Sequence, residues 1–272
     1  GLIHEWSGHR SIVHDMKWSS DGAHLVSSGA DGAVKIWTAE KRTELLSVHI
    51  MGPVIVYGLE LSEPYAHGSG EPSVFDQSIF VGSSDRSVVL LRPDPNQITD
   101  AGPLGGRSLH HGAPVNALAY DGGGRLLYSG DGRGRIVVWQ EIRHDAPPSA
   151  EGYAVLHRMD TGLFFRSLSL DPDMGLLVAA DGDTLRIYDR RTHRQVPTFF
   201  RGFCNRNGVV RASFSPDGRF VLAGTSPVLL LYTPLLHRNA PRSRLLRSPS
   251  PTKVPTKAPS GCGTPRPGSS AW

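Results

Sequence analysis

A histidine, a serine and an aspartate lie near the start of the chain, at His9, Ser27 and Asp31. These are the residue types of a serine hydrolase, in which a carboxylate orients a histidine that takes the proton of a serine nucleophile. A hydrolase also needs an exposed nucleophile and backbone donors for the developing oxyanion. The sequence has no Gly-x-Ser-x-Gly turn that would present the serine. We therefore predict no catalytic residue in this chain.

The strands that must carry these side chains belong to a repeating unit. Short runs of alternating apolar residues are separated by turns such as Asp31-Gly32, a pattern typical of antiparallel hairpins. Five blocks end at Trp37, Leu91, Trp139, Tyr188 and Tyr232, which are 54, 48, 49 and 44 residues apart. The second block carries an insertion from about Ser62 to Asp76. Because one such sheet cannot bury both of its faces alone, we expect neighbouring sheets to stack around a shared axis.

This pattern resembles the WD-repeat family, whose repeats span roughly 40–45 residues. The resemblance implies an all-β fold, a WD-repeat β-propeller with about five four-stranded blades out of a seven-bladed design. We place the propeller at residues 1–234, with blades near 8–52, 53–104, 109–157, 158–200 and 207–234. Five blades of seven would leave exposed strand edges. The alternatives are a fragment of a larger protein, an aberrant gene model and a closed five-bladed variant.

In WD-repeat blades, the positions of the apparent triad form a structural network together with a tryptophan. Asp31 can fix the ring of His9, His9 can bond Ser27, and Ser27 can reach the indole N–H of Trp37. Such a network stabilises a blade because buried polar groups need partners. The third block keeps His111, Ser129 and Trp139, with Arg133 at the aspartate position. The fourth and fifth blocks have Tyr188 and Tyr232 in place of tryptophan, and the second lacks it.

Several stretches are also similar to one branch of the WD-repeat family. They are Glu5–His9 with Ile12–Ser19, Tyr128–Asp131 with Ile136–Trp139, Thr184–Arg191, and Phe220–Gly224. Members of that branch are ciliary scaffolds at the basal body and transition zone that support cilium assembly and trafficking, so the resemblance implies a cytoplasmic or ciliary-base protein. The alternatives are a generic WD-repeat adaptor in another intracellular complex, a propeller enzyme, and a nucleic-acid-binding module.

The positive charge of the chain is concentrated at its C-terminal end. Seven of the 29 Lys and Arg residues and none of the 25 Asp and Glu residues follow His237, which leaves 22 basic against 25 acidic residues before it. We therefore expect no specific nucleic-acid binding by the folded body. Residues 235–272 are rich in Pro and Ser, and we predict a disordered tail. It is either an inert linker or a weak contact for anionic surfaces, and Ser248, Ser250 and Thr264 precede prolines as in proline-directed phosphorylation sites.

Other chemistry finds little support in the sequence. Two cysteines, Cys204 and Cys262, do not make a disulfide framework and fit a reducing compartment better. The histidines show no zinc-ligand spacing, and no apolar run reaches the length of a membrane helix. The glycine-rich stretches 122–124 and 130–134 are interpreted as hairpin turns, and Asp171 and Asp173 as solvent-facing loop residues. We predict no cofactor, no metal and no small-molecule substrate.

The partners implied by a rigid propeller are other proteins, bound by loops at its two faces. Aromatic residues and arginine dominate binding energies at protein interfaces. Five such residues stand in or near loops that lead into the blades, and we predict them as partner contacts: Arg10, Tyr57, Arg107, Phe164 and Arg206.

Overall fold

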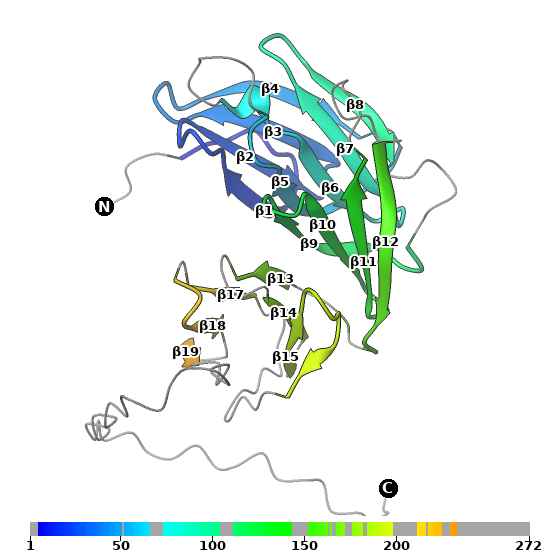
Figure 1. Ribbon diagram of the computed structural model, residues 1–272. Helices are drawn as coiled ribbons and strands as arrows, with labels where there is room; N and C mark the ends of the chain where they lie inside the picture. Colours follow the sequence, from blue (N-terminus) through cyan, green and yellow to red (C-terminus); the bar gives the residue numbers. More distant parts are fainter. Residues whose placement is uncertain are drawn as a thin grey trace, which may run out of the picture. The chain divides into compact units, whose positions relative to one another are not determined.

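The protein is seen here in a computed structural model, whose described residues form β-sheets and one short 3₁₀ helix, η1 (Val74–Asp76) (Figure 1). The structure describes residues 5–50, 52–65, 73–103, 111–142, 152–162, 164, 167–171, 176–181, 184–197, 211–215, 217–224 and 229–232. No helix within these ranges is long and apolar enough to cross a membrane. The predicted tail, Cys204 and Cys262 lie outside the described residues.

Five antiparallel sheets follow one another along the chain, which confirms the predicted propeller-type, all-β architecture. The first sheet comprises β1 (Val13–Trp18), β2 (His24–Gly29), β3 (Ala33–Thr38) and β4 (Thr43–His49). The second comprises β5 (Val56–Leu61), β6 (Ile79–Ser83), β7 (Val88–Pro93) and β8 (Ile98–Pro103). The third comprises β9 (Val115–Asp121), β10 (Leu126–Asp131), β11 (Arg135–Glu141) and β12 (Tyr153–Asp160). The fourth comprises β13 (Ser167–Leu170), β14 (Leu176–Asp181), β15 (Thr184–Asp189) and β16 (Gln195–Val196). The fifth has three strands within the described ranges, β17 (Ala212–Phe214), β18 (Val221–Gly224) and β19 (Leu229–Tyr232).

The turn between the second and third strands of a sheet requires left-handed backbone at one position. Glycine meets this requirement in the first and third sheets, where Gly32 has φ 74° and Gly134 has φ 86°. The second sheet has Arg86 at the same position, with φ 73°. A side chain other than glycine is disfavoured in this conformation by roughly 1–2 kcal/mol, so Arg86 introduces strain into its turn.

Successive sheets pack through their first strands. Contacts join β1 to β5, β5 to β9, β9 to β13, and β13 to β17. The first and second sheets share one hydrophobic cluster, and other clusters join the second sheet to the third and the third to the fourth. Polar groups add to the same interfaces: the amide of Leu59 donates to Asp15 Oδ2 at 3.1 Å, and the amide of Ala212 donates to Ser167 Oγ at 2.9 Å.

One face of the first sheet lacks the cover that its counterparts have. Met16, Leu59, Leu118 and Leu168 occupy equivalent positions, as their pairing with the second strand of each sheet shows. Leu59, Leu118 and Leu168 are 0%, 5% and 8% exposed, because each packs against the preceding sheet. Met16 is 58% exposed. The described part of the chain therefore leaves an apolar face of β1 open.

The prediction that Asp171 faces solvent is wrong, because this residue is buried. It lies where the fourth sheet meets a turn of the fifth, and a Cβ atom added at Gly218 would come within 2.2 Å of its Oδ1 atom. Its backbone carbonyl accepts a hydrogen bond from Arg190 Nη2 at 3.4 Å. Asp171 thus takes part in packing between sheets, while Asp173 lies outside the described residues.

The contrast between Met16 and Leu59 gives a test of the stacking. We expect Leu59→Ala to lower the free energy of unfolding by about 2–5 kcal/mol, because it empties space between two sheets. Met16→Ala, at the equivalent but exposed position, should change it by no more than about 0.5 kcal/mol. Urea unfolding of the two variants measures both values. Equal losses would contradict the arrangement of the sheets.

Candidate functional site

The structure brings His9, Ser27, Asp31 and Trp37 together in the first sheet. His9 Nδ1 lies 3.0 Å from Asp31 Oδ1, and His9 Nε2 lies 2.8 Å from Ser27 Oγ. The indole N–H of Trp37 donates to Ser27 Oγ at 2.8 Å. With the ring proton on Nδ1, as these partners favour, Trp37 donates to Ser27, Ser27 to His9, and His9 to Asp31.

This geometry uses the serine as a relay between two rings and buries it. Ser27 is 3% exposed, and its oxygen is occupied by the indole donor while its proton is directed at His9. A nucleophile must instead present its oxygen to a substrate. The arrangement serves to tie β2 and β3 to the loop before β1.

Asp31 is held as a carboxylate by its neighbours. Burial raises its pKa, but hydrogen bonds from the amide of Arg10, from His9 and from the amide of Ala33 outweigh that effect. The pKa of Asp31 falls to about 2 as a result. The charged form is therefore the one that stabilises the network.

The third sheet repeats the histidine–serine–tryptophan part of the network and places a different carboxylate beside the histidine, so the assignment of Arg133 to the aspartate position misses the acid that lies at the site. Ser129 Oγ lies 2.8 Å from His111 Nε2 and accepts from the indole of Trp139 at 2.7 Å. Asp131 Oδ2 lies 3.4 Å from His111 Nδ1, while its Oδ1 accepts from the amide of Arg133 at 2.8 Å.

The reason is positional. Asp131 lies at the end of β10, where Gly29 lies in the first sheet, and a Cβ atom added at Gly29 would come within 2.9 Å of His9 Nδ1. A side chain at this position therefore touches the histidine ring directly.

The second sheet replaces the network by apolar packing and a smaller polar cluster. Val81 and Leu91 occupy the serine and tryptophan positions, and both are fully buried. Asp85 Oδ1 accepts from the hydroxyl of Ser83 and, at 2.6 Å, from that of Ser87. In the fourth sheet Tyr188 is buried at the tryptophan position, and the side chain of Tyr232 lies outside the described ones.

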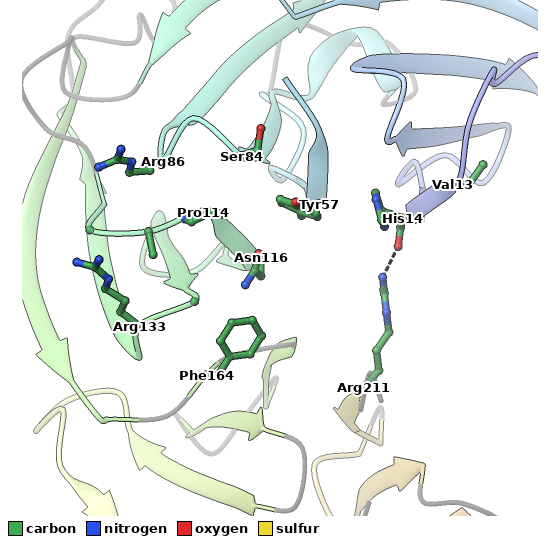
Figure 2. A pocket seen from close by; sticks show the side chains of 13 residues that line it. Val13, His14, Tyr57, Ser84, Arg86, Pro114, Asn116, Arg133, Phe164 and Arg211 are labelled. Atoms are coloured by element: carbon green, nitrogen blue, oxygen red, sulfur yellow. Dashed lines mark hydrogen bonds between the residues drawn. The ribbon is translucent and has the colours of Figure 1, made fainter. Parts of the chain in front are cut away.

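A cavity of about 870 Å³ opens where the first strands of the sheets begin. It is lined by Val13, His14, Tyr57, Ser84, Arg86, Gly112, Ala113, Pro114, Asn116, Gly132, Arg133, Phe164 and Arg211. Figure 2 shows Tyr57, Asn116 and Phe164 around the opening, with Arg211 reaching toward His14. Residues from the first three sheets and from the segments leading into the fourth and fifth contribute to one surface.

Three of the lining residues are the extra residues of β-bulges at the start of the first strand of a sheet. The pairing of first and second strands skips one residue in each of the first three sheets, namely His14, Tyr57 and Asn116. A β-bulge of this kind redirects the side chain of the extra residue. The repeat thus places a different functional group at the same point of each sheet, and the rings of His14 and Tyr57 lie 5.2 Å apart.

The charge of the cavity is positive. Arg86, Arg133 and Arg211 line it, and no Asp or Glu does. Arg211 is engaged, since its Nη1 donates to Asp15 Oδ1 at 2.6 Å and its Nη2 to the carbonyl of His14. Burial and the guanidinium of Arg211 lower the pKa of His14, so this ring is neutral at pH 7.

Two of the five predicted partner contacts, Tyr57 and Phe164, line the cavity. Arg10 is exposed and lies outside the lining, while its backbone binds Asp31. Arg107 and Arg206 lie outside the described residues, as do Ser248, Ser250 and Thr264. The sequence reasoning missed His14, Asn116, Arg86, Arg133 and Arg211. The signal for Arg86 and Arg133 was their place in turns that otherwise carry Asp and Gly.

No group of three or more His, Cys, Asp or Glu side chains in the described ranges is arranged to hold a metal ion.

Comparison with known proteins finds a repeat family and several relatives to which the chain is similar. The family described as "WD domain, G-beta repeat" matches residues 1–38 and 106–140, which include the histidine–serine–tryptophan networks of the first and third sheets. Jouberin of Mus musculus is 25% identical over 231 residues, covering 82% of this chain and 21% of jouberin. The U3 small nucleolar RNA-associated protein 15 homolog of Xenopus laevis is 26% identical over 72% of this chain and 41% of that protein. The SIR4-interacting protein SIF2 of Saccharomyces cerevisiae is 23% identical over 51% of this chain and 25% of its own length. The chain spans about a fifth of the length of the jouberins it matches.

Two adjacent serines of β2 test the network. Ser27→Ala leaves the Trp37 indole and the His9 ring without their partner, and should lower the free energy of unfolding by about 1–3 kcal/mol. Ser28→Ala removes a buried hydroxyl that has no hydrogen-bond partner within the described structure, and should leave stability unchanged or raise it. Thermal unfolding compares the two, and a larger loss for Ser28→Ala would contradict the assignment.

Acid should remove the contribution of Asp31. Its pKa is about 2 in the folded chain against about 3.9 when unfolded, so its stabilisation is complete above about pH 4 and is lost as the pH falls through about 2. We expect Asp31→Asn to be less stable than the natural chain at pH 7. The gap in unfolding free energy should narrow between about pH 4 and pH 2. Urea unfolding of both proteins at several pH values checks this, and a constant gap would exclude the role given to the carboxylate.

Proposed function

We propose that the chain is a non-catalytic WD-repeat scaffold that binds other proteins at the base of the cilium. The match of residues 1–38 and 106–140 to the WD-repeat family and the similarity to jouberin support this proposal. The observation that carries the scaffold role is the cavity to which the first three sheets and Phe164 and Arg211 contribute. Stacked sheets hold these loops in place, so a partner is bound without ordering the surface first. On this proposal Ser27 and its neighbours stabilise a blade and do no chemistry.

The ciliary location rests on the similarity to jouberin, whose branch of the family the sequence resembles. By that resemblance the chain would act at the basal body and transition zone, in cilium assembly and trafficking. Residues 1–234 would form the propeller and residues 235–272 a basic tail with phosphorylation sites at Ser248, Ser250 and Thr264.

A second candidate is an adaptor in another intracellular complex. The similarity to the U3 small nucleolar RNA-associated protein 15 homolog favours it, since it covers 72% of the chain at 26% identity. The two candidates use the same binding surface and differ in the complex that they join.

Localisation separates the candidates. We expect the tagged chain, expressed in ciliated cultured cells, to concentrate at the ciliary base beside a basal-body marker. Tyr57→Ala combined with Phe164→Ala should abolish that concentration, because it removes two aromatic contacts from the cavity. A matched control is Leu156→Ala with Leu45→Ala, exposed apolar residues outside the cavity lining, which should concentrate normally. Nucleolar accumulation would support the adaptor, and normal localisation of the cavity variant would overturn the binding surface.

A further inference from the structure

The cavity lining includes two arginines, Arg86 and Arg133, whose guanidinium groups form no ion pair among the described residues. Both residues are exposed. The carboxylates nearest in sequence, Asp85 and Asp131, already accept hydrogen bonds from other groups. Asp85 accepts from Ser83 and Ser87, and Asp131 binds two backbone amides beside His111.

Arg86 also stands where its backbone favours glycine. Gly32 and Gly134 hold the equivalent position in the neighbouring sheets with the same sign of φ. The turn gains nothing from an arginine there, and Arg86 is the one residue other than glycine with positive φ, among those described, that also lines the cavity. The turn of the third sheet carries Arg133 one position earlier, so two adjacent sheets each place one arginine in the lining of the same cavity. Figure 2 shows both guanidinium groups on the same side of the opening.

From these observations we propose that the cavity binds an acidic peptide segment, with Arg86 and Arg133 holding its carboxylate or phosphate groups. The planar guanidinium forms paired hydrogen bonds with either anion. Phe164, 39% exposed, lies against Gly132 beside Asn116, and offers a ring for an apolar side chain of the peptide. This inference rests on the proposed scaffold function and names the chemistry of its partner.

A peptide fits better than a nucleic acid. The two arginines form a local positive site, whereas residues before His237 contain more acidic than basic residues. A long polyanion needs a run of basic side chains along its backbone, and the count before His237 gives no excess of them. A short acidic peptide needs contacts with the cavity alone, and the two arginines are enough to hold its anionic groups.

Fluorescence anisotropy with the full chain tests the inference. The probes are a labelled twelve-residue peptide of Asp and Glu around one Phe, the same peptide with a phosphoserine replacing one acid, and a twelve-nucleotide single-stranded DNA. We expect both peptides to bind and the DNA to bind at least about tenfold more weakly. Tighter binding of one peptide identifies phosphate or carboxylate as the preferred anion.

Arg86→Gly separates recognition from folding. It supplies the residue that the turn prefers, so thermal stability should be kept or raised, while peptide affinity should fall by about tenfold or more. Arg42→Gly is the matched control, because Arg42 also has positive φ, at 57°, in the β3–β4 turn outside the cavity lining. It should leave affinity unchanged.

Equal affinity of Arg86→Gly and the natural chain, no peptide binding, or preferred binding of the DNA would each overturn the inference. These results do not depend on the location of the chain in the cell. If Arg86→Gly keeps its peptide affinity while the Tyr57→Ala and Phe164→Ala variant loses its localisation, the acidic-peptide inference is wrong and the proposed scaffold function stands. If the peptide affinity falls while that variant localises normally, the scaffold's binding surface is wrong and the peptide site stands.

Discussion

The structure depends on the packing of each first strand against the sheet before it. A four-stranded sheet of this sequence has two apolar faces, and only a neighbour on each side can bury both. Leu59, Leu118 and Leu168 reach near-complete burial in this way. Where no described sheet precedes, at β1, the equivalent Met16 stays exposed. Stability is therefore a property of the series of sheets, and each sheet contributes through its neighbours.

Within the sheets, the polar network tolerates changes that keep its chemistry. The first and third sheets conserve a serine between a histidine and an indole, at nearly equal distances. Their carboxylates come from different positions of the same turn, Asp31 and Asp131. In both sheets a carboxylate lies beside Nδ1 of the histidine, at 3.0 Å for Asp31 and at 3.4 Å for Asp131. The second sheet lacks the histidine contact and buries Val81 and Leu91 instead.

The same scaffold that buries these networks exposes the cavity. A bulge in each of the first three strands turns one residue toward it, and the repeat varies that residue from His14 to Tyr57 to Asn116. Variation at a fixed geometric point is how a repeat protein acquires a specific surface without altering its packing. Arg86 extends this principle to a position where the variation strains the backbone.

The sequence by itself determined the all-β class, the five sheets and the first network, because strand alternation, Asp-Gly turns and the spacing of His9, Ser27 and Trp37 are local signals. It also singled out Tyr57 and Phe164. Only the tertiary structure decided that Asp131 supplies the third carboxylate, that Asp171 is buried, and that His14, Asn116 and Arg211 meet at one cavity. These outcomes depend on bulges and on contacts between residues far apart in the chain. Arg211 donates a hydrogen bond to Asp15, which lies 196 residues away in the sequence, and no local sequence pattern predicts such a contact.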